Sequence, residues 1–388
     1  MTPKQREQRM EFCRLIATWY MNNQCTEARP WATSNGADLG RFMYEYCPST
    51  GQWHGNAVWG QGAGAMALLA LHDRLISSGP SGELLQSAMD AYLAKACYDA
   101  AIAAGGYMMS LQVLDQRNPA LFGIFRQSHP QSDLMNPRDG ATGCMGLCVL
   151  YRHTKNEEYL YRARIFGDWY IRNAFEKKHR WPYYTYYFDP SRHIWNEPGL
   201  WQVGAGLAFY YLYRLTGERR YLDEGLQPLM DGVRNRFPPE SRPGNDDFAG
   251  VAVMGAYLLT GDARLLDWTV AHAAAQVAAQ DEDGSCPLLE GAQVTGINLL
   301  NFCQLAQEKK RDIDLAPYRA ATAKIARFLP TLQERDPRDL RAYGGIYGQT
   351  SFGVSRHLIH HRAACYSLIF MIREEGLTDV AGYNVFGW

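Results

Sequence analysis

Residues 213–222 read Tyr213-Arg-Leu-Thr216-Gly-Glu-Arg-Arg-Tyr221-Leu222, and the same pattern occurs three times in the chain. The other copies are Tyr151-Arg-His-Thr154-Lys-Asn-Glu-Glu-Tyr159-Leu160 and Tyr257-Leu-Leu-Thr260-Gly-Asp-Ala-Arg-Leu265-Leu266. In each copy an apolar segment ends near the threonine, and an amphipathic segment begins a few residues later. We interpret each copy as the tight turn of a helical hairpin. A repeated unit that is too small to bury its own apolar face is typical of a helical repeat or a closed ring.

The other segments with helical spacing predict an all-α ring of six hairpins. Crowding of the inner helices by their neighbours explains their many glycines and alanines, although each glycine inside a helix loses roughly 1 kcal/mol. The outer helices keep one polar face. We expect inner helices at residues 56–76, 139–153, 199–213, 246–259, 290–307 and 351–374, and outer helices at 4–22, 82–104, 157–175, 221–237, 263–280 and 315–332.

Two adjoining glycines, Gly105-Gly106, are expected to break the second outer helix. Residues 107–116 would then form an additional short helix, which leaves a seventh hairpin possible. No strand-rich stretch and no low-complexity linker interrupts the rhythm of the chain. We therefore expect a single domain that spans residues 1–388.

The composition argues against several classes of protein. A formal net charge of -1 and a pI near 6.8 argue against nucleic-acid binding, because no basic stripe is present to neutralise phosphates. No apolar run is long enough to cross a bilayer, so we expect no membrane partner. The N-terminus lacks the apolar core of a signal peptide, which leaves localisation open: cytoplasmic, or periplasmic or secreted if a leader was removed.

Motifs for bound groups are also missing. The sequence has no P-loop and no dinucleotide fingerprint, and its nine scattered cysteines suggest free thiols. The His357-x-x-His360-His361 run has no glutamate inside it, unlike a zincin motif, so we expect neither a metal nor a cofactor. By contrast, 24 tyrosines and 10 tryptophans, concentrated in loops, suggest stacking on sugar rings.

The two kinds of connection differ in length and chemistry. Those from inner to outer helices are short, whereas the opposite ones are long and rich in Trp, Tyr, His, Arg and carboxylates. The fullest example begins at Arg180 and runs to the helix that follows Pro198. Functional groups are often carried by loops on a rigid frame, so we expect the cleft on the rim where the long loops gather.

An acid stands near the start of several inner helices. Capping of the helix is the simpler explanation for most of them, because acids favour the positive end of a helix. Glu197 is harder to explain in this way, since Pro198 follows it and a histidine, a tryptophan and an asparagine precede it. The acids are Asp139, Glu197, Asp246 with Asp247, and Glu290.

A second candidate region is the loop Arg341-Ala-Tyr343-Gly-Gly-Ile-Tyr347. A tyrosine can remove a proton if nearby cations lower its pKa, and the next segment supplies candidates for that field. The alternative is that the tyrosines pack the rim and that the histidines lie on a helix face. The candidate cations are Arg356, His357, His360 and His361.

The hairpin rhythm resembles the (α/α) toroid carbohydrate-active enzymes, and the resemblance covers most of the chain. It implies an (α/α)6 barrel that acts on a polysaccharide or oligosaccharide. Within this group, the residue types resemble those of polysaccharide lyases of the glucuronan and alginate type. These enzymes pair a tyrosine acid/base with Arg, His or Asn, which are present here as Tyr347, Arg341, His193 and Asn196.

The resemblance implies β-elimination on a uronic-acid-containing glycan. His193, Asn196 and Arg341 would bind the uronate carboxylate, Tyr347 would remove the C5 proton, and Glu197 would orient His193 or Arg341. Aromatic and polar residues of the long loops would bind the sugar chain. The substrate-binding candidates are Trp53, His54, Arg138, Trp181, Trp195, Trp201, Asp246, Tyr343, Arg356, His357 and His361.

Three alternatives remain. A glycoside hydrolase would use Glu197 as general acid and Asp246 or Asp247 as base, because glycosidases need two carboxylates at the bond. A sugar epimerase would use a pair of histidines and would not cleave the chain. A non-catalytic helical scaffold would have no concave site on the rim.

Overall fold

A computed structural model describes residues 2–27, 38–77, 88–242, 244, 246–287, 290–350, 353–374 and 383–386. Side chains are described for the same residues except 349, 350 and 353–357. One continuous cluster of buried apolar side chains extends from Met10 to Val385.

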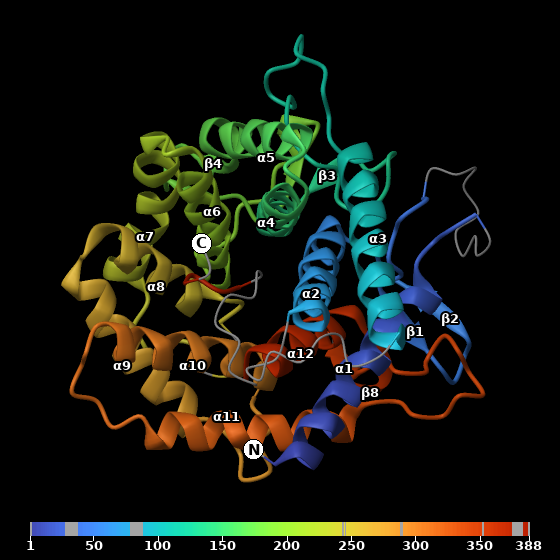
Figure 1. Cartoon of the computed structure of the whole chain (residues 1–388). Coiled ribbons are helices and arrows are strands. Elements are labelled where there is room, and N and C mark those ends of the chain that lie inside the picture. The colour runs from blue at the N-terminus through green and yellow to red at the C-terminus, as the bar shows by residue number, and fades with distance from the viewer. Residues whose placement is uncertain are drawn as a thin grey trace.

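Six inner helices form a closed ring, which confirms the predicted (α/α)6 toroid (Figure 1). Each inner helix packs on the next, and the last one, α12, packs on α2 and closes the ring. The third inner helix begins with a 3₁₀ segment, η3 (Leu200–Ala205). The inner helices are α2 (Val58–Ile76), α4 (Pro137–Thr154), α6 (Gly206–Thr216), α8 (Ala249–Thr260), α10 (Gly291–Glu308) and α12 (His361–Glu374).

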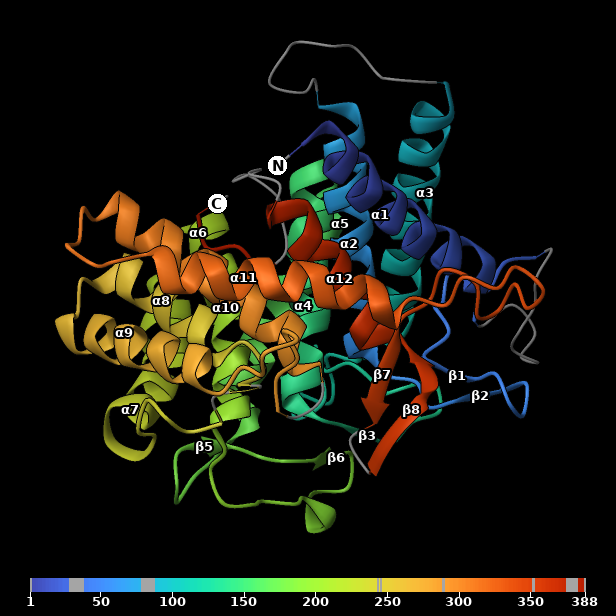
Figure 2. The ribbon, with the colours of Figure 1, turned by 90° about the horizontal axis from the view of Figure 1, so that it is seen from below.

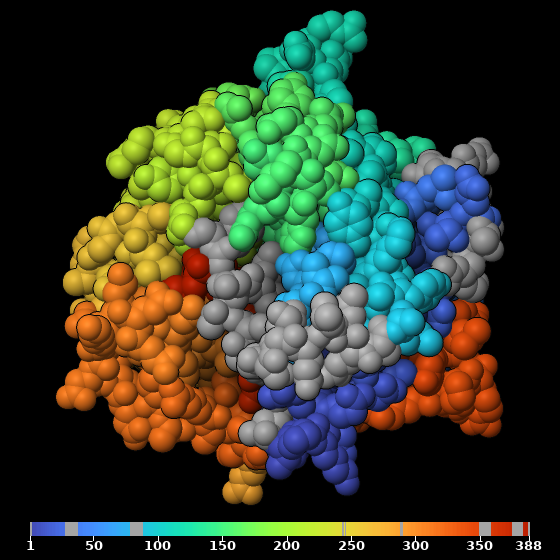
Figure 3. Space-filling model, viewed as in Figure 1, coloured from blue at the N-terminus to red at the C-terminus, as the bar shows by residue number. Residues whose placement is uncertain are grey.

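The outer helices surround this ring in chain order, so the colour runs from blue around to orange in Figure 3. They are α1 (Pro3–Asn23), α3 (Ala88–Ser110), α5 (Glu157–Trp169), α7 (Gln227–Arg236), α9 (Ala263–Ala278) and α11 (Ala316–Phe328). The short helices beside them are η1 (Tyr170–Ala174), η2 (Pro190–Arg192), η4 (Tyr221–Leu226) and η5 (Leu329–Leu332).

The predicted break at Gly105-Gly106 is wrong. Helix α3 continues through both glycines to Ser110, and residues 107–116 form no separate helix. Two glycines weaken a helix without ending it when tertiary packing supports both sides. Residues 82–87 of the predicted helix lie outside the described part of the chain.

The three copies of the turn have the same local structure. In each copy the threonine hydroxyl donates to the carbonyl four residues earlier and accepts the backbone N–H two residues later. The residue after the threonine ends the helix in the left-handed region, with φ of 57° at Lys155, 70° at Gly217 and 69° at Gly261. The repeated threonine therefore satisfies polar backbone groups that the helix end leaves without partners.

Close packing between inner helices explains their glycines. A Cβ atom added to Gly62 on α2 would lie 2.3 Å from the carbonyl oxygen of Thr142 on α4. A Cβ atom added to Gly146 would lie 2.6 Å from the Cα of Gly62. The two backbones meet here, so any side chain would push α2 and α4 apart.

The chain is mostly helical, as predicted, but its long connections contain short strands that the sequence did not predict. A four-stranded sheet has the order β2-β1-β8-β7, in which β1 (Glu45–Cys47) pairs with the end of β8 (Gly353–His360). Residues 353–360 are thus a strand rather than the first half of the last inner helix. The other strands are β2 (Gln52–His54), β3 (Leu134–Met135), β4 (Phe175–Glu176), β5 (Trp181–Pro182), β6 (Tyr186–Tyr187) and β7 (Tyr347–Thr350).

The strands and long connections gather on one side of the ring, as predicted for the loop rim. Figure 2 shows β3, β5, β6, β7 and β8 along its lower edge and the marks for both termini on the opposite side. Every inner helix begins on the strand side, so the first turns of all six point towards one rim. None of the helices in the described ranges is both long enough and apolar enough to cross a membrane.

Candidate active site

The first residues of the inner helices include several with unusual backbone angles. Asp247, Phe248 and Glu290 have φ angles of 53°, 68° and 42°. These values lie in the left-handed region, which is unfavourable for residues with a side chain. Such strain persists where surrounding contacts enforce it, and it is concentrated at functional sites.

Asp246 is a structural residue at the start of α8. Its side chain is fully buried and accepts hydrogen bonds from the backbone N–H groups of Phe248 and Gly250 at 3.0 and 2.6 Å. His272 Nε2 and Asn298 Nδ2 lie 2.9 and 2.8 Å from its two oxygens. Burial raises the pKa of Asp246, but the contacts with His272 and Asn298 outweigh that effect and leave the pKa below its usual value. Asp246 therefore fixes the turn that carries Asp247.

Asp247 is held between two arginines. Arg138 Nε lies 3.1 Å from its Oδ2, and Arg362 Nη2 donates to its Oδ1 at 3.0 Å. Arg138 Nη2 also donates to the backbone carbonyl of Asp247 at 3.0 Å. The Asp247 side chain retains 13% exposure, so the two guanidinium groups fix an accessible carboxylate.

Asp139 supplies a second carboxylate from α4. It is only partly buried, and Gln127 Nε2 donates to its Oδ2 at 2.5 Å. Burial raises the pKa of Asp139, and the positive charges of Arg138 and Arg362 oppose that rise only in part. Asp247 is close enough to raise the pKa further.

Glu290 lies deeper in the site. Its side chain is fully buried, and neither carboxyl oxygen has a hydrogen-bond donor among the described residues. The nearest basic side chains are His360, whose Nδ1 lies 3.5 Å away, and Arg362, whose Nε lies 3.7 Å away. Burial raises the pKa of Glu290, and His360 and Arg362 oppose the rise.

His360 and Glu45 complete the group through the pairing of β1 with β8. His360 Nε2 lies 2.9 Å from Glu45 Oε1, and the two residues are register partners. Glu45 retains 18% exposure. We call these residues the central cluster: Glu45, Arg138, Asp139, Asp247, Glu290, His360 and Arg362.

The tyrosine of the lyase prediction lies in a different setting. Tyr347 donates to Glu334 Oε2 at 2.6 Å, and burial together with this acceptor raises the pKa of Tyr347. The predicted lowering of its pKa by cations is therefore wrong. Arg341 Nη1 donates to the Gly51 carbonyl at 3.2 Å, and its Nε donates to Asp339.

Further predicted residues lie around Arg341. Its guanidinium stacks over the ring of Tyr46, which also packs on Trp53. His54 is exposed, and Tyr343 is partly buried. The side chains of Arg356 and His357 lie outside the described residues.

The segment around Glu197 forms a separate group. Glu197 and Asn196 are exposed, and His193 Nδ1 accepts the backbone N–H of Tyr187 at 3.2 Å. Within the described residues, none of the contacts of Arg341 or Tyr347 reaches residues 193–201. The structure therefore does not bring the five predicted catalytic residues into contact.

The predicted sugar-stacking residues differ in exposure. Trp195 stacks on His179 with ring centroids 4.0 Å apart, and the partly exposed Trp201 meets Tyr184 edge to face. Trp181 is only 1% exposed and donates its indole N–H to Gln202, so its face is not available to a sugar.

His361 is also a core residue. It stacks on Tyr44 and is fully buried. Burial lowers the pKa of His361 to about 3, so it stays neutral near pH 7.

Sequence reasoning therefore found part of the central cluster. The acids at the starts of inner helices pointed to Asp139, Asp247 and Glu290, although only Asp246, Asp247 and Glu197 were assigned roles in the hydrolase alternative. Glu45 and Arg362 were missed. No local signal marks them, because their position depends on a strand pairing between residues more than three hundred positions apart.

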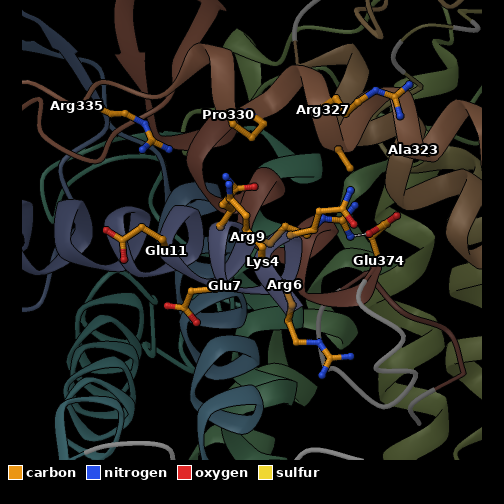
Figure 4. A pocket seen from close by; sticks show the side chains of 13 residues that line it. Lys4, Arg6, Glu7, Arg9, Glu11, Ala323, Arg327, Pro330, Arg335 and Glu374 are labelled. Atoms are coloured by element: carbon orange, nitrogen blue, oxygen red, sulfur yellow. Dashed lines mark ion pairs between the residues drawn. The ribbon is translucent and has the colours of Figure 1, made fainter. Parts of the chain in front are cut away.

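A charged groove lies between α1 and α11 (Figure 4). Its volume is about 1170 Å³, and its lining mixes cations such as Arg6 and Arg327 with Glu7, Glu11 and Glu374. Arg9 forms an ion pair with Glu374 there. Glu374 ends α12 and Arg362 begins it, so the groove lies roughly 18 Å along the helix from the central cluster.

Comparison with known proteins supports the fold but assigns no family. No protein-family model matches the sequence, and no curated protein matches it. Solved structures similar to this chain include a sugar epimerase from a ruminal bacterium, with a TM-score of 0.67 and 12% identity over 96% of this chain and 99% of that one. A glycoside hydrolase family 76 mannosidase of Bacteroides thetaiotaomicron gives 0.59 and 16%, over 95% and 100%.

A third similar structure is that of an inactivated enzyme with a bound sugar. It is an inactive variant of an alpha-1,6-mannanase of Salegentibacter sp. HEL1_6 in complex with alpha-1,6-mannotriose. Two consecutive aspartates are replaced by asparagine in that variant, and the TM-score is 0.56 with 13% identity over 94% and 98% of the two chains. At these identities the similarities show a shared (α/α)6 fold.

Proposed function

We propose that this protein is a glycoside hydrolase and that Asp139 and Asp247 are its two catalytic carboxylates. The observation that carries the proposal is the contrast between their surroundings. Asp139 is partly buried with a raised pKa, whereas Asp247 is fixed by two arginines. Two carboxyl groups with unlike environments are what glycoside hydrolysis requires.

The environments assign the roles. A raised pKa keeps the proton on Asp139, so this residue donates it to the oxygen of the leaving sugar. Asp247, which Arg138 and Arg362 hold in place, acts at the anomeric carbon, either directly or through water. The two arginines also fix its orientation. Paired aspartates matter in the mannanase named above, whose variant lacking two of them is inactive.

The charge of the cluster favours an uncharged glycan. Four carboxyl groups gather there, and both guanidinium groups are already engaged by Asp247. A uronate would bring a further negative charge without a free cation among the described residues of the cluster. The lyase prediction therefore has no support from the site, and the similar structures described above are a sugar epimerase, a mannosidase and a mannanase.

A sugar epimerase is the second candidate, because the highest of the quoted TM-scores belongs to an epimerase. His360 lies between two carboxyl groups and could move a proton. The neighbouring histidine, His361, is not available as its partner, because it is buried in the aromatic core. Analysis of products distinguishes the two functions, because an epimerase changes a sugar without releasing new reducing ends.

The test is a panel of neutral oligosaccharides and polyuronates, with reducing ends and ultraviolet absorbance followed together. We expect new reducing ends from a neutral glycan and no gain in absorbance. Asp139→Asn and Asp247→Asn should each lower kcat/KM by roughly 10²–10⁴-fold while the fold is retained.

Three control variants sharpen this test. Glu197→Gln and Tyr347→Phe should keep the activity, because within the described ranges neither side chain has a hydrogen bond or ion pair with the central cluster. Asp246→Asn should act through stability, since loss of a buried charge partner typically removes about 3–5 kcal/mol. Full activity in Asp247→Asn, or loss of activity in Glu197→Gln at unchanged stability, would refute the assignment.

A further inference from the structure

Glu45, His360 and Glu290 form a short chain of titratable groups that leads from the surface of the site to its interior. Glu45 is partly exposed, His360 is 2% exposed, and Glu290 is fully buried. His360 Nε2 lies 2.9 Å from Glu45 Oε1, and His360 Nδ1 lies 3.5 Å from Glu290 Oε1. The three residues come from β1, β8 and the start of α10.

The hydrogen-bond directions define the resting state of this chain. The backbone N–H of Arg362 donates to His360 Nδ1 at 3.0 Å, so Nδ1 is an acceptor. A neutral His360 therefore carries its proton on Nε2 and donates it to Glu45. Among the described residues neither oxygen of Glu290 has a hydrogen-bond donor, and burial of this kind favours the protonated form of a carboxyl group.

We propose that His360 transfers a proton between the buried Glu290 and the partly exposed Glu45. In this step Glu290 gives its proton to Nδ1, while Nε2 gives its proton to Glu45. The Arg362 N–H bond to Nδ1 opens, Glu290 becomes a carboxylate, and Glu45 becomes a carboxylic acid. His360 is again neutral, with its proton on Nδ1, so one proton has crossed the chain.

The neighbouring groups favour this exchange. Arg362 Nε lies 3.7 Å from Glu290 Oε2 and stabilises the carboxylate that forms, although Asp247, just before α8, and Glu45 oppose it. Tyr44, whose ring centroid is 5.3 Å from that of His360, stays protonated because burial raises its pKa well above the usual value. His361 also stays neutral, so His360 is the group that carries the proton.

In the proposed hydrolase these three titratable groups make Glu45 a third acid of the site, beside Asp139 and Asp247. This use rests on the proposed function. During a turnover Glu45 would take its proton from Glu290. Between turnovers solvent would protonate the partly exposed Glu45, and the reverse transfer through His360 would return the proton to Glu290. His360 is then a positioning residue that acts through Glu45. The contacts among Glu45, His360 and Glu290 do not depend on any enzymatic activity. Their effect on the stability of the protein can therefore be measured separately.

The experiment compares His360→Gln with His360→Asn, each with and without Glu290→Gln. The glutamine amide reaches the position of Nε2, and the asparagine amide reaches that of Nδ1, but neither carries a proton across. Thermal unfolding is followed from pH 5 to pH 8. Both single variants should lose stability more steeply than the wild type as pH rises, because ionised Glu290 then lacks its histidine. Adding Glu290→Gln should remove the extra slope.

The kinetic measurement uses the same variants on the glycan that the wild type hydrolyses. We expect kcat/KM to fall about 10²-fold and its pH optimum to move to lower pH, where solvent can protonate Glu45. Stability curves parallel to the wild-type curve would overturn the proton chain. An extra slope with an unchanged optimum would overturn its catalytic use. If no glycan is hydrolysed, the proposed function fails. The unfolding curves still test whether His360 links Glu290 to Glu45.

Discussion

Glu290 combines three unfavourable features in one residue. It has a left-handed backbone, a fully buried side chain and two carboxyl oxygens without donors. None of these features stabilises the fold, and a buried polar group without a hydrogen bond typically costs about 1–3 kcal/mol. Residues of this kind persist at sites where function requires them.

Glu290→Gln should therefore stabilise the protein, and the gain should depend on pH. Burial raises the pKa of Glu290 in the folded state, so its contribution is retained below the pKa of the unfolded chain and is lost as pH rises through the folded pKa. We expect a gain of about 1–3 kcal/mol at pH 8 and almost none near pH 4, measured by chemical denaturation. The exposed Glu197→Gln is the control, with no pH-dependent gain. An equal gain at both pH values would contradict this account.

Helix α3 shows how packing decides the effect of a glycine. Gly105 faces α4 and α5, and a Cβ atom there would lie 2.6 Å from Leu150 Cδ1 and 3.1 Å from the ring of Tyr159. A Cβ atom on Gly106 would meet nothing within 4 Å. Position 105 thus has no room for a side chain, whereas position 106, the next residue in the same helix, does.

Substitution by alanine tests this difference. Gly106→Ala should raise the free energy of unfolding by up to about 1 kcal/mol, because alanine is the better helix former and the position is open. Gly105→Ala should lower it by about 1–3 kcal/mol, because the methyl group forces Leu150 and Tyr159 apart. Each variant is the control for the other in denaturant unfolding. Equal effects would mean that helix propensity outweighs packing at this point.

At the scale of the whole molecule, residues 383–386 lie in the middle of the ring (Figure 1). Tyr383 stacks on Phe248 with ring centroids 3.7 Å apart, and Asn301 Nδ2 donates to the Tyr383 carbonyl at 2.9 Å. Tyr210 donates its hydroxyl to the carbonyl of Val385. This segment connects α6, α8 and α10 and supports the turn that carries Asp247.

Tyr383→Ala should weaken the ring and the site together. Loss of a buried aromatic side chain typically removes about 3–5 kcal/mol of stability. Because Phe248 follows Asp247 directly, kcat/KM should also fall at temperatures where the variant is fully folded. The exposed Tyr184→Ala should leave the stability within about 0.5 kcal/mol of the wild type. Unchanged stability in Tyr383→Ala would show that the segment is not required for ring closure.

The sequence alone determined the ring of hairpins. Its signals are local: helical spacing of apolar residues, threonines that satisfy helix ends, and small residues where inner helices meet. It also placed the long, chemically rich connections on one rim. Each of these features depends on neighbours within a few turns of the chain, which is why it can be read before the chain is folded.

Only the tertiary structure decided which residues of that rim form a site. The strand at residues 353–360 pairs with its chain neighbour β7, and its last two residues also pair with β1. Local spacing contains no record of this second partner, which lies about three hundred residues away. The same pairing brings His360 to Glu45 and places Arg362 beside Asp247. Electrostatic interactions act through space over a few ångströms, so the roles of these groups are fixed only when the ring has closed.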